Sequence, residues 1–213
     1  VELMHVKYGL VLAEEGKKFA TREGRAVFLH EVTEKAIRLA RRIVEEKNPS
    51  LSTREKEGIA EAVGIGALKY ANLKENRHSD IVFGWSRMLD LRGDSGPYLQ
   101  YAYARLQGIL RKAATSKKAD VKTLTGEQEY SLVRKLIEFP DSVRESVETC
   151  STNNLAHYLY TLATLVNQFY ETTPILKDEN IVRRSTRLVL IEIVAEVLKR
   201  GLGLLGIKAI PRI

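Results

Sequence analysis

Cysteine occurs only once in the 213 residues, at Cys150. A single cysteine excludes an internal disulfide and any metal site built from several cysteines. The four histidines lie far apart in the sequence, and no two have a metal-ligand spacing such as H-x-x-x-H. We therefore predict no metal site, assign no catalytic role to a histidine, and interpret Cys150 as a buried structural thiol.

Long apolar runs are also missing, since all of them are far shorter than the roughly 20 residues that a membrane helix needs. The first twelve residues are interrupted by Glu2, His5 and Lys7, which argues against a signal peptide. We expect no membrane partner and a cytoplasmic location. The chain begins with Val rather than Met, as a fragment of a longer protein would.

The chain carries only a mild excess of positive charge. Hydrophobic residues make up 44% and charged residues 29%, which is typical of a folded globular protein rather than a disordered one. The net charge of +7 is spread over both halves, without a basic tail. Such a surface suits a phosphate backbone, although many proteins that bind no nucleic acid share it.

The start of the chain has the pattern of strands and loops. Positions 5–12 are rich in β-branched and aromatic residues, a charged turn covers 14–18, and 26–29 form another apolar run. These features predict two short strands, and a third is expected at 80–83. A turn-rich break at 93–97 predicts a domain boundary, which divides the chain into residues 1–92 and 93–213.

Helical periodicity dominates after position 29. One helix is expected to end before Asn48, and a second to begin after Ser52, with Glu55 completing a capping box. A long helix is expected from Pro97, because proline is favoured at the first helical position. Further helices are expected at 127–138, 141–148 and 155–169, and in a last segment that closes at Gly206. Five helices with short connections predict a helical bundle for residues 93–213.

Four segments, in order, resemble one protein family. Residues 9–24 (GLVLAEEGKKFATREG) resemble the ATP-site signature loop of arginyl-tRNA synthetases. Residues 64–73, followed by 76–77 and 79–80, resemble the next segment of that family. Residues 96–105 (GPYLQYAYAR) resemble the opening of its anticodon-binding domain, and 204–212 its C-terminal end. The resemblance implies a mainly α fold, in which a helical anticodon-binding bundle of the DALR type follows a small α/β remnant of a class I catalytic domain.

The resemblance also implies a function. The chain would be the C-terminal part of an arginine–tRNA ligase, which uses ATP with Mg to form arginyl-adenylate and then transfers arginine to the 3′ end of its tRNA. Arginine-accepting tRNA and the upstream rest of the catalytic domain are the implied partners, and a monomer is expected. The chain contains no His-x-Gly-His element, which holds ATP in this class of enzyme. The fragment alone is therefore expected to be inactive and to hold no cofactor.

The signature loop has residue types that suit adenylate formation. This reaction develops negative charge on the α-phosphate and on pyrophosphate, which cations and hydroxyl donors on a mobile loop stabilise. The predicted ATP-binding residues are Gly16, Lys17, Lys18, Thr21 and Arg22. Of these, Lys17, Lys18 and Arg22 are the predicted catalytic residues, while many family members have Lys where this chain has Ala20. The competing interpretation is a solvated basic turn in a β-hairpin.

The long helix of the second domain carries a stripe that suits unpaired bases. Tyr98 and Tyr101 are three residues apart on one helix face, and Arg105 lies four beyond Tyr101. Unpaired RNA bases stack on aromatic rings and guanidinium planes. By resemblance, Tyr170 and the terminal Ile213 join this predicted anticodon contact, although the family usually ends in Met. The competing interpretation is a core stripe with a snorkelling arginine.

Two other functions stay open on the sequence alone. One is a non-catalytic tRNA-binding homologue that has lost ligase activity, and the other is a helical interaction module without an RNA partner. The loop at 14–24 favours a ligase, because a pure binding module needs no loop that stabilises phosphate charge. The stripe of Tyr98, Tyr101 and Arg105 favours RNA binding over the interaction module.

Overall fold

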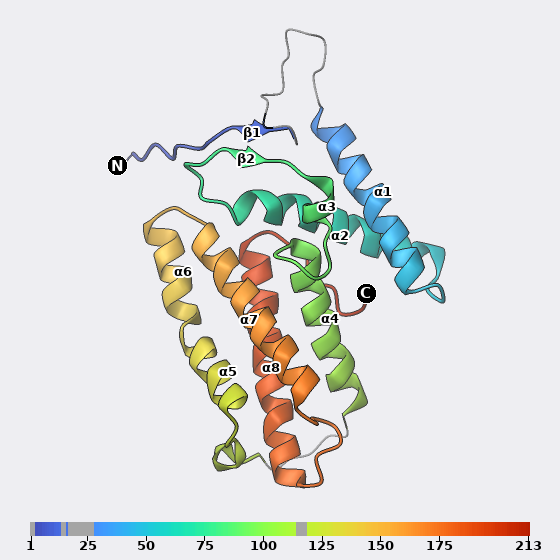
Figure 1. Ribbon diagram of the computed structural model, residues 1–213, viewed down its shortest axis with the longest axis vertical. Coiled ribbons are helices and arrows are strands. Elements are labelled where there is room, and N and C mark those ends of the chain that lie inside the picture. Colours follow the sequence, from blue (N-terminus) through green and yellow to red (C-terminus); the bar gives the residue numbers. More distant parts are fainter. Residues whose placement is uncertain (1–2, 14–15, 17–27, 114–118) are drawn as a thin grey trace.

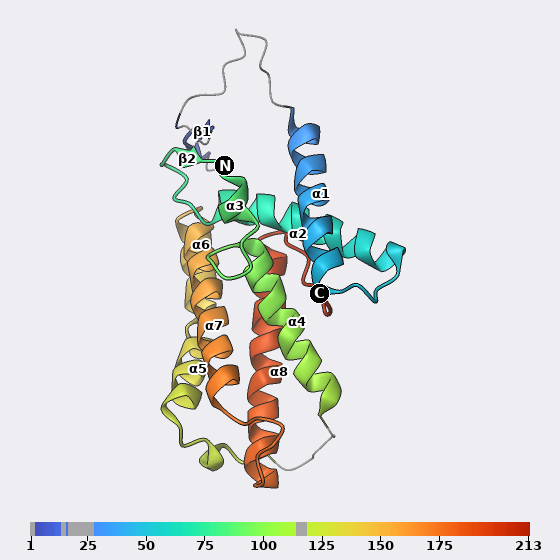
Figure 2. The ribbon, with the colours of Figure 1, turned by 45° about the vertical axis from the view of Figure 1, so that its right-hand side comes forward.

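The computed structural model describes residues 3–13, 16, 28–113 and 119–213 and is mainly helical, which confirms the predicted fold class (Figure 1). The second half of the chain forms a long helical bundle, and the first half packs across one end of it. Figure 2 shows the same arrangement from a second direction. The first described residues, which lead into the strands, and the C-terminus lie at this same end of the bundle, on the side of the first half.

The two short strands are β1 (Val11–Leu12) and β2 (Ile81–Val82), which pair in parallel. Both lie within predicted strands, although they are shorter. Two backbone segments approach each other closely beside β1. A Cβ on Gly9 would lie 2.1 Å from the Ser79 carbonyl oxygen. Only glycine fits at that position.

The strand predicted at 26–29 is wrong at Leu29, where the first helix begins. The Glu31 carboxylate accepts a hydrogen bond from the Phe28 backbone N–H at 3.2 Å, so that a local cap starts a helix where the apolar run predicts a strand. Positions 26 and 27 lie outside the described residues.

Two helices of the first half, α1 (Leu29–Lys47) and α2 (Thr53–Leu73), pack against each other. The predicted capping box is confirmed at the start of α2. The Ser52 hydroxyl accepts from the Glu55 N–H at 3.3 Å, and the Glu55 carboxylate accepts from the Ser52 N–H at 3.0 Å. Small buried side chains on α1, Ala36 and Ala40, let α2 approach closely. A short helix, α3 (Trp85–Met88), follows β2 and leads to the bundle.

The bundle consists of α4 (Gly96–Lys112), α5 (Glu127–Ile137), α6 (Phe139–Glu148), α7 (Asn153–Thr172) and α8 (Ile181–Leu204), with a 3-10 turn at Val121–Thr123. These are the five predicted helices, with one correction: Phe139 and Pro140 open α6 instead of separating it from α5. Proline is tolerated in a first helical turn, because the backbone N–H there has no partner within the helix. The interior of the bundle is aliphatic and aromatic, with Leu99, Leu132, Leu159, Phe169 and Leu198 fully buried.

The chain ends in a segment that lies between the two halves. Gly206 closes α8 with a φ of +68°, and the Ile207 N–H donates to the Leu202 carbonyl at 2.8 Å, as in a Schellman motif. Beyond it, the fully buried Gln100 side chain donates to the carbonyls of Ala62 and Lys208, at 3.0 and 2.8 Å. Gln100 therefore joins α4 to α2 and to the C-terminal segment.

Cys150 is only half-buried, whereas the sequence predicts a buried thiol. Its φ of +49° lies in the left-handed region, in the turn between α6 and α7. This turn places the thiol beside the chain start, with Sγ 3.3 Å from the Met4 sulfur.

Candidate nucleic-acid interface

A groove of about 650 Å³ runs between α4, α7 and the segment that leads into α4. Its volume lies in the range of about 300–1,000 Å³ that is typical of ligand sites. Residues from both halves of the chain line it, among them Lys47, Arg92, Tyr98, Tyr101, Arg105, Asn167 and Glu171.

The predicted stripe on α4 lies in the wall of this groove. Tyr98, Tyr101 and Arg105 are each partly exposed, and the Arg105 Cζ lies 5.0 Å from the centre of the Tyr101 ring. Tyr98 also packs against the core of the bundle, with its ring 5.6 Å from that of Tyr160. The fold brings the three side chains together, and Tyr98 serves the core as well as the groove.

Tyr170 on α7 comes to the same place. Its ring centre lies 5.1 Å from the Arg105 Cζ, and 43% of the residue is exposed. The guanidinium of Arg105 therefore contacts two aromatic rings, one from α4 and one from α7. Together these three side chains offer aromatic rings and a guanidinium plane of the kind on which an unpaired base can stack.

Asn167 is a residue of the groove that the sequence does not single out. Its Oδ1 accepts from Arg105 Nη1 at 2.8 Å, and its Nδ2 donates to the Tyr98 hydroxyl at 2.9 Å. The Glu171 carboxylate lies 4.0 Å from the same guanidinium. The helical spacing of Asn167, Tyr170 and Glu171 is the signal that could have revealed a polar face of α7 opposite the stripe.

The terminal Ile213 is not among the residues that line the groove. It is half-buried and packs against the core formed by α1 and α2. Nearby, the Arg111 guanidinium donates to the Pro211 carbonyl at 2.9 Å. The predicted anticodon contact of Ile213 stays a prediction.

The predicted ATP loop falls largely outside the described residues. Lys17, Lys18, Thr21 and Arg22 all lie there. Gly16 is described: it is exposed, its φ is +72°, and no described atom lies within 4 Å of the place that a Cβ would take. This left-handed conformation favours glycine at the edge of the loop.

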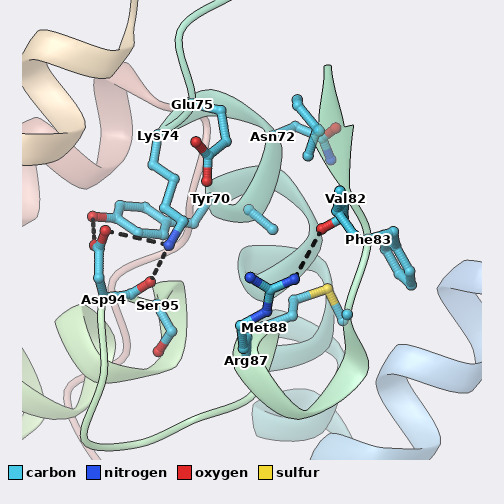
Figure 3. A pocket seen from close by; sticks show the side chains of 13 residues that line it. Tyr70, Asn72, Lys74, Glu75, Val82, Phe83, Arg87, Met88, Asp94 and Ser95 are labelled. Atoms are coloured by element: carbon cyan, nitrogen blue, oxygen red, sulfur yellow. Dashed lines mark hydrogen bonds and ion pairs between the residues drawn. The ribbon is translucent and has the colours of Figure 1, made fainter. Parts of the chain in front are cut away.

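A smaller cavity, of about 60 Å³, lies where the first half meets the start of α4 (Figure 3). Tyr70 of α2 and Lys74, the residue that follows this helix, point to Asp94. The Tyr70 hydroxyl lies 2.6 Å from Asp94 Oδ1, and the Lys74 ammonium donates to the Asp94 carbonyl at 2.8 Å. Burial, followed by the hydrogen bond to Asp94, raises the pKa of Tyr70. Because these polar groups satisfy one another, the cavity is a structural junction.

In the described part of the chain, no three His, Cys, Asp or Glu side chains are placed to hold a metal ion. None of the described helices combines the length and apolar character needed to cross a bilayer.

Two family models together cover nearly the whole chain. Residues 99–213 match the DALR anticodon binding domain, and residues 1–85 match the catalytic domain of class I tRNA synthetases of the (R) type. The chain belongs to the arginyl-tRNA synthetase family. In this member of the family, the groove lies on the segment that matches the DALR domain, apart from Tyr98 and the residues that the first half contributes.

Named relatives agree with this assignment. The chain is 45% identical over 210 residues to an arginine–tRNA ligase of Chromobacterium violaceum, an alignment that covers 99% of this chain and 36% of the relative. It is 40% identical to the arginine–tRNA ligase of Colwellia psychrerythraea, covering 100% of this chain and 37% of that one. The chain thus spans little more than a third of the length of these relatives.

Solved structures of the family have the same fold. The arginyl-tRNA synthetase of Thermus thermophilus matches with a TM-score of 0.90 at 36% identity, over 98% of this chain and 35% of that chain. The arginyl-tRNA synthetase of Plasmodium falciparum matches with a TM-score of 0.83 at 28% identity, over 100% of this chain and 36% of that chain.

Proposed function

We propose that the bundle binds the anticodon loop of arginine-accepting tRNA in the groove between α4 and α7. The whole protein would be an arginine–tRNA ligase that uses ATP with Mg. The observation that carries the proposal is the placement of the Arg105 guanidinium against the rings of Tyr101 and Tyr170, where Asn167 holds it. Base stacking on such side chains contributes about 1–3 kcal/mol per base.

We propose a domain boundary near residue 92, between the part of the catalytic domain and the tRNA-binding bundle. Two buried clusters support it, one in the bundle and one built mainly from α1, α2 and α3. Two residues cross this boundary. Tyr70 of α2 belongs to the buried cluster of the bundle, and Ile210 belongs to the buried cluster of the first half.

Binding of tRNA tests the proposal. Replacing Arg105 with Ala removes a cation and the link between two rings, so we expect weaker binding of arginine-accepting tRNA. We also expect the slope of log affinity against log salt to flatten by about 0.7, the value for one lost phosphate contact to a single strand. The control is Arg144→Ala, which removes an exposed cation on α6, outside the groove. Equal affinity of wild type and Arg105→Ala would contradict the proposal.

For the loop, we propose that Lys17, Lys18, Thr21, Arg22 and Gly16 contact ATP in the whole enzyme. Lys17, Lys18 and Arg22 would stabilise charge that develops in the transition state, so Lys18→Ala or Arg22→Ala should lower the rate of adenylate formation more than arginine affinity. Unchanged turnover in both variants would mean that the loop is only a surface turn. The present chain alone should show no arginine-dependent exchange of pyrophosphate, because it has no His-x-Gly-His element.

Tyr98 and Ile213 complete the proposed anticodon contact, with Tyr98 shared between groove and core. We further propose that the protein acts as a monomer in the cytoplasm, where its tRNA would be charged. Sedimentation of the whole enzyme with and without tRNA tests the monomer, and a dimer at working concentration would contradict it.

A further inference from the structure

The cations of the groove fall into two groups. Arg105 is engaged by the two rings and Asn167, and Glu171 lies 4.0 Å from its guanidinium and offsets part of its charge. Lys47 and Arg92 also line the groove, and both are exposed. Within the described residues, neither of these two side chains forms an ion pair or donates a hydrogen bond. A polyanion that enters the groove would therefore meet two cations that are not already held in an ion pair.

We propose that Lys47 and Arg92 bind phosphates of the RNA strand whose bases stack on Tyr101 and Tyr170. The inference rests on the proposed function and deepens it, because it makes the anticodon site a composite of both halves of the chain. The bundle supplies the surface for the bases together with Arg105, and the first half supplies two further contacts to the backbone. Nucleic-acid interfaces commonly divide in this way between groups that position the backbone and groups that contact bases.

The local structure fixes where both cations stand. Lys47 is the last residue of α1, and its helix is held by the buried Ala40 and Val44. Arg92 lies in the turn before α4, where its backbone N–H donates to Asp90 Oδ1 at 2.8 Å. The Ser95 hydroxyl, which caps α4, donates to the carbonyl of Asp90. The turn that carries Arg92 is thus tied to the start of the helix that carries Tyr98 and Tyr101.

The test is the salt dependence of binding to an RNA stem-loop with the anticodon arm of an arginine-accepting tRNA. The variant is Lys47→Gln with Arg92→Gln, which removes two charges and keeps long side chains. Its slope of log affinity against log salt should be smaller by about 1.4, at about 0.7 for each lost phosphate contact. The matched control, Arg134→Gln with Lys199→Gln, removes two exposed charges from α5 and α8 outside the groove and should keep the wild-type slope.

A second arm uses the same RNA with uncharged methylphosphonate linkages in the loop. Wild type should lose affinity for this RNA, whereas the Lys47→Gln, Arg92→Gln variant should distinguish the two RNAs much less. Melting of each protein confirms that it is folded. If the double variant keeps the wild-type slope while Tyr101→Ala weakens binding, the phosphate contacts are wrong and the proposed function stands. If wild type does not bind the RNA at all, the proposed function itself fails.

Discussion

Asn167 is a single side chain on which the geometry of the groove depends. It accepts a hydrogen bond from Arg105 and donates one to the Tyr98 hydroxyl, so it joins α7 to two positions of α4. Without it, the guanidinium would still contact two rings but would lose its fixed orientation. We therefore regard Asn167 as a positioning residue that acts through Arg105.

Replacing Asn167 with Ala should weaken RNA binding roughly ten-fold, since a hydrogen bond to a charged group contributes about 1.5–3 kcal/mol and 1.4 kcal/mol is a factor of ten. Titration of the RNA stem-loop measures the effect in two backgrounds, wild type and Arg105→Ala. If Asn167 acts through Arg105, the loss should largely disappear in the Arg105→Ala background. An equal loss in both backgrounds would contradict this role.

At the scale of elements, the contact between α1 and α2 depends on Gly64. A Cβ there would lie 2.8 Å from the Ile37 backbone, which is too close for any real side chain. Ala is the better helix former by about 1 kcal/mol, but overpacking against a backbone costs about 1–3 kcal/mol. We therefore expect Gly64→Ala to lower the free energy of unfolding, measured by urea denaturation.

Gly58 is the matched control in the same helix, because nothing lies within 4 Å of its added Cβ. Gly58→Ala should raise the free energy of unfolding by about 0.5–1 kcal/mol through helix propensity alone. If both variants were stabilised, the close approach of the two helices at Gly64 would be wrong.

The far end of the bundle is held by a buried network of charges. Arg187 of α8 donates to Glu129 of α5 and to Asp178 in the connection before α8, each at 2.6 Å, and both carboxylates are almost fully buried. Removing one partner of a buried pair costs about 3–5 kcal/mol, because a charge is left uncompensated. Arg187→Met should therefore lower the free energy of unfolding by an amount of this order, while Arg200→Met, at an exposed pair on the same helix, should change it little.

At acid pH, the difference in free energy of unfolding between wild type and Arg187→Met should become smaller. Hydrogen bonds from the Arg183 side chain hold the pKa of Asp178 below its usual value, and the charge of Arg187 lowers it further. Only the contribution of Arg187 is missing in the variant. A carboxylate with a lowered folded-state pKa stabilises the fold above its unfolded pKa of about 3.9, and this contribution is lost as the pH falls below that value. Melting curves of both proteins at pH 7 and below pH 4 measure this stability difference. A difference that does not depend on pH would contradict a role for the carboxylates.

Local signals explain which elements could be predicted. The cap at Ser52 and Glu55 lies within four residues, so the sequence alone reveals it. The Phe28–Glu31 cap is just as local, but a run of apolar residues predicts a strand there. Gly64 and Asn167 could not be interpreted in advance, because their roles depend on segments that meet only in the folded chain.

On the scale of the whole molecule, the two halves share a groove and part of their cores, although the predicted boundary separates them. The stripe on α4 was visible in the sequence, but Lys47 and Arg92 lie outside that helix and join the stripe only through the fold. Ile213, which we propose as part of the same contact, packs on the first half. Helix periodicity shows which residues share a face, and it does not show which other helix that face meets.

The shared core gives a prediction for residues 97–213 alone. This piece should be mainly helical by circular dichroism and should melt cooperatively, because it contains the five helices of the bundle. It should melt below the whole chain, since it lacks the fully buried Tyr70, and a large buried aromatic side chain contributes about 3–5 kcal/mol. A mainly β signal, or a melt without a cooperative transition, would contradict an independent bundle.

The central claim is that the groove between α4 and α7 binds the anticodon loop, and Tyr101→Ala tests it most directly. Tyr101 is partly exposed and touches Arg105, so its loss should remove stacking without opening the core. Affinity for arginine-accepting tRNA and melting temperature are measured on the same sample. We expect binding to weaken roughly ten-fold or more, from about 1–3 kcal/mol per stacked base, with little change in melting. A protein that melts far lower yet binds tRNA normally once folded would show that Tyr101 belongs to the core and that the groove is not the binding site.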